Sequence, residues 1–311
     1  MNKRHSRHFT ASTNQGFTLL EVVLVLFLMG LVASAGLMLT ENVEDQAKYD
    51  ETRQRMLMMR QAIIGNSTRT LNGRPEIGGF VADMKRLPGC VRELLSSEDC
   101  DGNALALWAR DASTGVGAGW RGPYLYVSPE SDGQRYFRDA YGNSDASDAI
   151  NSGWDYQLSG EKIGLSSKGL DGVSGTGDDV SDAELIMAAD WQINSIQIRF
   201  VNNSSTALPS SAEGVKLRVI LSNKDDKLDS SNTVSFASGA IPSSGSVVKI
   251  FNFDASNAVP LGSHGYLLFC TTNTSGAIFD GGCTQDIAYP DDVRYFTVAP
   301  HANHTLDWVI Q

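Results

Sequence analysis

The residues with the clearest capacity for chemistry form an acidic, glycine-rich segment near the middle of the chain. Between Ser166 and Asp179 lie the carboxylates of Asp171, Asp178 and Asp179, together with four glycines. Calcium takes about six to eight oxygen ligands, and a glycine-rich loop can direct carboxylates and backbone carbonyls towards one ion. The segment lacks the acidic start and the final glutamate of an EF-hand. From these residues alone, a solvated acidic turn is favoured over a calcium loop, and both interpretations stay open.

A second group of residues, near the N-terminus, could support processing of the chain. Gly16 and Phe17 lie shortly before Glu21, the only carboxylate at the start of a long apolar run. Cleavage after Gly16 would create an α-amino group on Phe17. A carboxylate in or near hydrocarbon is costly and usually paired. Glu21 could therefore pair with that amine, within one helix or between staggered helices; a water-exposed interfacial glutamate is the simpler alternative.

The four cysteines fall into two close pairs, Cys90 with Cys100 and Cys270 with Cys283. Neither pair has CxxC spacing, and no histidine lies at zinc-finger distance from them. Disulfides are typical of exported chains. Three connectivities are possible, and local pairing is favoured because each pair brackets a short loop. We therefore predict two local disulfides with a structural role.

Other patterns that could carry catalysis or metal binding are weak. Gly117–Gly122 matches GxGxxG, but Pro123 follows where the helix of a dinucleotide site would have to continue. We found no GxSxG or HExxH motif, and the sequence predicts no enzyme. Two further groups are interpreted as surface residues rather than metal ligands: His301 and His304 beside Asp307, and Asp225, Asp226 and Asp229.

The elements that must position these residues begin with a basic leader and an apolar helix. Residues 1–16 contain three Lys or Arg residues and no acid, and residues 22–39 carry no charge. This run has about the length of a membrane-spanning helix, and the leader would hold the N-terminus in the cytoplasm. Ala33-Ser34-Ala35 could instead be the cleavage site of a secretory signal. Because the pattern continues into an amphipathic helix that ends near Gly65, a retained membrane anchor is favoured.

The remainder of the chain changes character twice. Residues 66–115 mix turns with short helical pieces, and residues 120–191 read as short strands on long loops. Further on, alternating apolar runs separated by Ser, Asn, Gly and Pro predict an immunoglobulin-like β-sandwich. These runs are 193–201, 215–221, 247–253, 266–271, 295–298 and 305–310. The predicted fold class is α+β: a long N-terminal helix packed on a small antiparallel β-sheet domain, followed by an all-β sandwich.

The charge of the chain bounds its partners. The formal net charge is −11, and it would be more negative without the basic leader. Nucleic-acid binding requires a basic surface, so this composition argues against such a partner. Acidity is compatible with a soluble surface and with divalent cation sites.

The run Gly16-Phe17-Thr18-Leu19-Leu20-Glu21, with its basic leader and apolar helix, resembles the prepilin signature of type IV pilins and type II secretion pseudopilins. The resemblance implies cleavage after Gly16 by a prepilin peptidase, N-methylation of Phe17 and a role for Glu21 in filament assembly. It implies further partners, namely other pilin or pseudopilin subunits and an inner-membrane assembly platform. It also implies a single-pass inner-membrane protein with a cytoplasmic N-terminus, which enters a periplasmic or extracellular filament.

A second resemblance covers the middle of the chain. The segments Trp120–Leu125, Asp139–Asn143 and Trp154–Tyr156 follow the order seen in major-pseudopilin-like domains. The acidic segment resembles the calcium loop of those domains, and this resemblance favours a structural calcium ion over the solvated turn. The implied ligands are Asp171 and Asp178, with Asp179 and Ser167 as further candidates. Where the family has Asp-Pro-Trp-Gly-Asn-Pro-Tyr, this chain has Asp139-Ala140-Tyr141-Gly142-Asn143-Ser144-Asp145 and loses both prolines.

The sequence thus predicts four parts: a leader at 1–16, a helix at 17–65 that spans the membrane at about 22–39, a pseudopilin-like calcium domain at 66–191 and a β-sandwich at 192–311. The predicted function is that of a structural subunit, minor or specialised, of a type II secretion pseudopilus or a type IV pilus. The C-terminal domain would contact a secreted substrate or a surface ligand. The alternative is a membrane-tethered binding or adhesion module that does not polymerise.

Overall fold

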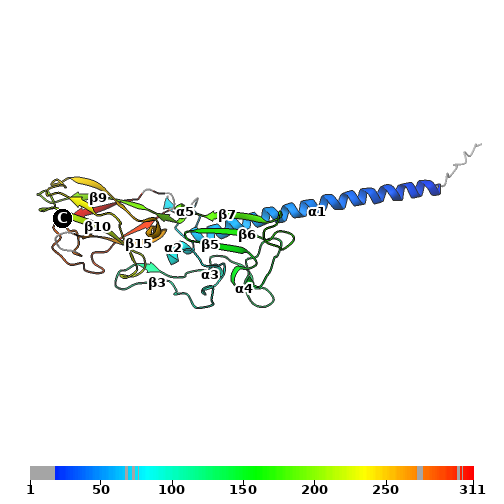
Figure 1. The fold of residues 1–311 in the computed structure, drawn as a ribbon, viewed down its shortest axis with the longest axis horizontal. Coiled ribbons are helices and arrows are strands. Elements are labelled where there is room, and N and C mark those ends of the chain that lie inside the picture. Colours follow the sequence, from blue (N-terminus) through cyan, green and yellow to red (C-terminus); the bar gives the residue numbers. More distant parts are fainter. Residues whose placement is uncertain are drawn as a thin grey trace, which may run out of the picture. The chain divides into compact units, whose positions relative to one another are not determined.

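The computed structural model describes residues 18–66, 69–71, 74–75, 77–271, 276–299, 302 and 304–311, without the side chains of residues 35–42, 71, 74 and 75. Gly16 and Phe17, the predicted processing residues, lie outside this part of the chain. Two compact units are present, Met1–Lys48 and Tyr49–Gln311. Figure 1 shows the helix α1 and the strands of the second unit.

Helix α1 spans Leu19–Ile64. It begins after Thr18, whose backbone and side-chain oxygens accept the N–H of Glu21 at 3.0 and 3.3 Å. It ends at Gly65, which has a φ of +79°, and a Cβ at this position would come within 2.6 Å of the Gly78 carbonyl oxygen. Only glycine adopts this conformation in such a confined space without strain. The predicted end of the helix near Gly65 is confirmed.

The last turns of α1, within the second unit, are amphipathic. Thr52, Met56, Met59 and Ile63 recur at spacings of four, three and four residues and are buried. This spacing places them on one side of a helix. Met56, Met59 and Ile63 join the main apolar core, which includes Phe80, Leu94 and Trp154.

The elements that follow α1 are short. A three-stranded antiparallel sheet in this part of the chain has the order β5-β6-β7. Its strands are β5 (Asp155–Ser159), β6 (Lys162–Ser167) and β7 (Val180–Ile186), and the acidic segment connects β6 to β7. The other elements are β1 (Thr70–Leu71), β2 (Arg74–Pro75), α2 (Phe80–Met84), α3 (Arg92–Leu95), β3 (Ala109–Arg110), β4 (Gly117–Ala118), α4 (Asp148–Asn151) and α5 (Ala188–Trp191).

The C-terminal part of the second unit contains two larger sheets. The first has the order β11-β10-β15-β16, with β12 also paired to β10, and the second has the order β13-β9-β17. β17 runs parallel to β9 and places Trp308 opposite Phe200. The strands are β9 (Ser195–Asn202), β10 (Glu213–Ile220), β11 (Lys227–Asp229), β12 (Val234–Phe236), β13 (Ser246–Asn252), β15 (Gly262–Cys270), β16 (Arg294–Val298) and β17 (Thr305–Ile310). A small pair joins β8 (Gln192–Ile193) to β14 (Val259–Pro260), and a short 3-10 turn, η1, spans Ala255–Asn257.

Aromatic side chains fill the space between these two sheets. The ring of Phe200 on β9 lies 4.9 Å from that of Phe236 on β12, and Tyr266 on β15 lies 6.0 Å from Trp308 on β17. β9 alternates between exposed and buried residues, as a strand with one covered face does. All six predicted runs overlap strands, and the prediction of an α+β fold with an all-β C-terminal part is confirmed.

Among the residues that the structure describes, no helix combines the length and the hydropathy needed to cross a membrane. The predicted span at 22–39 includes residues 35–39, whose side chains lie outside the described ones. The span is therefore not confirmed. The predicted domain boundaries after residues 65 and 191 likewise stay predictions.

Candidate functional site

The loop between β6 and β7 folds back on itself, as the calcium interpretation requires. Gly169 has a φ of +58°, and a Cβ there would come within 2.5 Å of both the carbonyl oxygen and Oδ2 of Asp178. Glycine is therefore needed for this close approach. Oδ2 of Asp178 accepts the N–H groups of Leu170 and Asp171 at 2.6 and 3.0 Å. The predicted ligands Asp171 and Asp178 are thus brought together.

Thr176 lies between the carboxylates of this loop. Its Oγ1 is 2.7 Å from Oδ1 of Asp178, 3.3 Å from Oδ1 of Asp171 and 3.4 Å from Oδ1 of Asp179. The carbonyl oxygen of Val173 lies 3.1 Å from the same hydroxyl. A hydroxyl has one proton to donate, so it cannot satisfy four acceptors at once. Thr176 was not predicted as a site residue, although a hydroxyl between Asp171 and Asp178 was visible in the sequence.

The charges of the three carboxylates are not balanced within the described part of the chain. Lys168, the lysine of this loop, forms an ion pair with Asp145 instead. The pKa of Asp178 is lowered by the hydroxyl of Thr176, and also by the N–H groups of Asp171 and Leu170, so this carboxyl is ionised at neutral pH. Carboxylate, hydroxyl and carbonyl oxygens are hard ligands suited to calcium. The kinds of oxygen in this loop therefore match those that bind calcium.

A buried polar network connects the loop to α1. The hydroxyl of Ser167 donates to Oδ2 of Asp139 at 2.6 Å, and Asn143 donates to the same oxygen and to the Gly169 carbonyl, both at 2.8 Å. The carbonyl of Asp139 accepts a hydrogen bond from Arg55 of α1 at 3.1 Å. The hydroxyl of Ser167 is thus engaged by Asp139, and its predicted role as a metal ligand stays a prediction.

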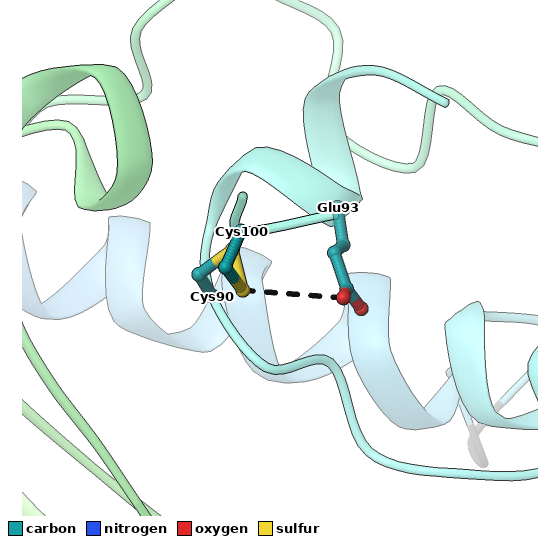
Figure 2. Close-up of side chains that lie close together, drawn as sticks. All are labelled: Cys90, Glu93 and Cys100. Atoms are coloured by element: carbon teal, nitrogen blue, oxygen red, sulfur yellow. Dashed lines mark hydrogen bonds between the residues drawn. A yellow bond between two sulfur atoms is a disulfide. The ribbon is translucent and has the colours of Figure 1, made fainter. Parts of the chain in front are cut away.

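Both predicted disulfides are present with local pairing, Cys90–Cys100 and Cys270–Cys283. Figure 2 shows the first beside α3, where Oε1 of Glu93 lies 4.0 Å from the sulfur of Cys100. Because both sulfurs are bonded to each other, neither offers a thiolate to a metal ion. Glu93 is instead held by the guanidinium of Arg86 at 2.7 Å and by the N–H of Gly89 at 3.2 Å.

A buried glutamate also stands beside the second disulfide. Glu213 lies within 4.8 Å of the sulfurs of Cys270 and Cys283, and its carboxylate accepts the hydroxyl of Ser211 at 2.7 Å. Among the described residues, these are the two groups of three His, Cys, Asp or Glu residues whose potential ligand atoms all lie within 4.8 Å of one another. The three carboxylates of the acidic loop do not form such a group.

Most of the residues that the sequence analysis interpreted as surface residues rather than metal ligands have other hydrogen-bond or ion-pair partners. Asp226 accepts the hydroxyl of Ser222, and Asp229 pairs with Arg218 at 2.6 Å. Asp307 pairs with Arg199 at 2.6 Å, and Nε2 of His304 lies 3.4 Å from the Ala299 carbonyl. His301 lies outside the described residues. Asp229 and Asp307 therefore have cationic partners of their own.

The first turns of α1 present an apolar surface around Glu21. Glu21 is exposed in the first turn, where its charge is favourable to the helix dipole. Every described side chain from Thr18 to Ser34 is exposed. Twelve of them are large and apolar: Leu19, Leu20, Val22, Val23, Leu24, Val25, Leu26, Phe27, Leu28, Met29, Leu31 and Val32.

A family model described as the prokaryotic N-terminal methylation motif matches residues 11–37. This motif is the signature of type IV pilins and pseudopilins, and the matched range includes Gly16, Phe17 and Glu21. Comparison with curated proteins and with solved structures finds no match. The resemblance predicted from the N-terminal residues is confirmed.

Proposed function

We propose that this chain, which carries the pilin and pseudopilin signature, is a minor or specialised structural subunit of a type II secretion pseudopilus or a type IV pilus. One observation carries the proposal. The methylation motif at residues 11–37 includes the first turns of α1, whose twelve large apolar side chains between Leu19 and Val32 are exposed. A large exposed apolar surface of this kind is typical of an interaction site with a membrane or with other proteins.

The physical chemistry of this surface favours insertion and assembly. Burying one large apolar side chain contributes about 1.5–3 kcal/mol. A membrane, and later the neighbouring helices of a filament, would provide that apolar environment. The unmethylated precursor would sit in the inner membrane with its N-terminus in the cytoplasm. After cleavage the subunit would move into a periplasmic or extracellular filament.

Glu21 gives the assembly its register in this proposal. An ionised carboxylate among apolar helices requires a partner. The amine created on Phe17 by a prepilin peptidase supplies a positive charge, and the staggered neighbour brings this amine to Glu21. The subunit is a substrate of that peptidase and has a structural role. Its further partners are other pilin or pseudopilin subunits and an inner-membrane assembly platform.

We also propose that the β6–β7 loop holds a structural calcium ion. Asp171, Asp178 and Asp179 would hold it, with Thr176 among them, and the ion would supply the positive charge that this loop lacks. The all-β part is proposed to contact a secreted protein or a surface ligand. Its size favours a minor or specialised role.

Substitution of Glu21 tests the filament proposal against a simple membrane tether. Filaments are sheared from cells that produce Glu21→Ala, and this chain is quantified in the filament and membrane fractions. We expect at least a tenfold loss from the filament fraction. Glu44→Ala is the control, because Glu44 is an exposed glutamate on the same helix that pairs only with Lys48 in the described residues. Wild-type incorporation of Glu21→Ala would contradict the proposal and favour the tether.

A further inference from the structure

A cleft of about 350 Å³ lies between α2, the β3–β4 pair and strands β15 and β16. All of these elements belong to the unit Tyr49–Gln311. The hydroxyl of Tyr295 on β16 donates to the Thr114 carbonyl at 2.7 Å and joins the two sides of the cleft. Its lining includes Asp83, Lys85, Trp108, Arg110, Arg121 and His264.

The cleft is positively charged although the chain is acidic. Arg121 pairs with Asp83 at 2.7 Å, so these two charges compensate each other. Lys85 donates to the carbonyls of Ala82 and Ser263 at 2.6 and 3.0 Å, and both acceptors are uncharged. Within the described part of the chain, no carboxylate forms an ion pair with Arg110. Two positive charges are left over in a chain whose net charge is −11.

The backbone conformations of Lys85 and Gly262 determine the position of the Lys85 ammonium group. Lys85 ends α2 in a left-handed conformation with a φ of +62°, which is costly for a residue with a Cβ. Gly262 faces it with a φ of +113°, and a Cβ there would come within 2.6 Å of Nζ and 2.5 Å of the Ala82 carbonyl oxygen. Burial lowers the pKa of Lys85 to about 8, so the group is still charged at neutral pH. A buried ammonium with only carbonyl partners favours an anion nearby.

His264 contributes a buried acceptor without a partner. Its Nε2 lies 2.8 Å from the Pro260 carbonyl oxygen and therefore carries the proton of a neutral ring. Burial lowers the pKa of His264 to about 3, which keeps the ring neutral. Nδ1 is buried and has no hydrogen-bond partner. An unsatisfied buried acceptor costs about 1–3 kcal/mol.

Aromatic rings stand at the edge of the same cleft. The side chain of Trp108 is 41% exposed and that of Tyr295 is 57% exposed. The guanidinium of Arg121 lies 5.5 Å from the Trp108 ring and helps to fix its position. Exposed tryptophan and tyrosine rings offer apolar faces with a polar edge, which suits a ligand that has both C–H and O–H groups.

We propose that this cleft binds an acidic carbohydrate, with a uronate carboxylate held by Lys85 and Arg110 and a sugar ring against Trp108. The positive charge selects the carboxylate, and the apolar face of Trp108 selects a sugar ring rather than an acidic peptide. The binding site does not depend on the proposed filament role.

Binding of tri-galacturonate to the full-length protein in detergent tests the proposal, with tryptophan fluorescence and calorimetry as readouts. We expect the fully methyl-esterified trisaccharide, which is neutral, to bind at least tenfold more weakly. Arg110→Gln and Trp108→Ala should each raise the Kd of the acid form about tenfold. Arg135→Gln, which changes an exposed arginine outside the cleft, should leave it unchanged.

Several outcomes would overturn the assignment. One is equal binding of the acid and the ester, and another is an unchanged Kd for Arg110→Gln. Absence of binding by the folded wild type at millimolar ligand, or binding of hexaglutamate in its place, would also refute it. Lys85 is buried, so loss of binding in Lys85→Met would not separate binding from packing. Arg110 is exposed, so its variant keeps the test decisive.

Discussion

The two ends of α1 differ in whether the rest of the chain covers their apolar side chains. From Leu19 to Val32 the apolar side chains are exposed around the helix, whereas from Thr52 to Ile63 the buried side chains follow one face and join the core. The apolar side chains of the second stretch are buried against other residues of the same chain. In the proposed function, a membrane or neighbouring helices would cover the first stretch. The difference between the two stretches lies in the pattern of their apolar residues.

The largest expected effect comes from placing a charge in the first stretch. Leu26→Asp should abolish recovery in the membrane and filament fractions, because a carboxylate at the centre of an apolar span costs about 2.5–3.5 kcal/mol. Leu57→Asp is the matched control, since Leu57 has a similar exposure, 58% against 63%, on the same helix. Fractionation followed by immunoblotting measures both. Equal behaviour of the two variants would remove the distinction between the stretches.

A cavity in the second stretch should lower the stability of the folded unit. Met59 is fully buried, and Met59→Ala should cost about 2–5 kcal/mol of unfolding free energy. Met58, its neighbour, is 46% exposed, so Met58→Ala should cost less than about 0.5 kcal/mol. Urea unfolding measures the difference. A small effect at Met59 would mean that this stretch is not part of the core.

The acidic loop extends the comparison to charge, because Asp171, Asp178 and Asp179 form no ion pair with any described residue. Removal of calcium should lower the Tm of the wild type by about 5–10 °C, since a ligand at 100 times its Kd contributes about 2.7 kcal/mol. Asp178→Ala should lose most of this response. Asp225→Ala, in the acidic turn after β10, should keep it. An identical response of wild type and Asp178→Ala to chelation would contradict the calcium proposal.

Lys85 gives a smaller, pH-dependent effect. Burial lowers the pKa of Lys85 to about 8 in the folded chain, against an ordinary value of 10.5. The charge of Asp83 opposes this shift, and that of Arg121 adds to it. Asp226 and His264 are the other titratable groups near Lys85. Between these values the unfolded chain binds more protons, so stability rises with pH. From pH 8 to 9.5 the wild type should gain up to about 2 kcal/mol relative to Lys85→Met.

The measurement for Lys85 is urea unfolding at several pH values. The range stays below pH 10 because burial raises the pKa of Tyr124 and Tyr156, and deprotonation of these tyrosines would favour the unfolded chain. Parallel curves for the wild type and Lys85→Met would show that Lys85 is not buried as an ammonium.

Much of the fold could be predicted because its signals are local. The end of α1 follows from Gly65, the strands follow from alternating residues, and both disulfides join cysteines at most 13 residues apart. The carboxylates of the proposed calcium loop were also local, since Asp171 and Asp178 share one glycine-rich loop. Periodicity and spacing capture such features without any knowledge of tertiary contacts.

The features that sequence reasoning missed depend on contacts between distant residues. Lys85 meets the Ser263 carbonyl across 178 residues, and Tyr295 meets the Thr114 carbonyl across 181. No periodic pattern indicates that a lysine and a histidine will be buried at the same cleft. The parallel pairing of β17 with β9 was equally hidden, because alternation predicts a strand but not its neighbour.

The N-terminus of the mature chain tests most directly whether the motif at residues 11–37 is cleaved and methylated. Filaments are isolated from cells with an active prepilin peptidase, and the chain is analysed by N-terminal mass spectrometry. The proposed function predicts a chain in the filament fraction that begins at Phe17 and carries an N-methyl group. A chain that remains uncut in the membrane fraction and is absent from filaments would contradict it.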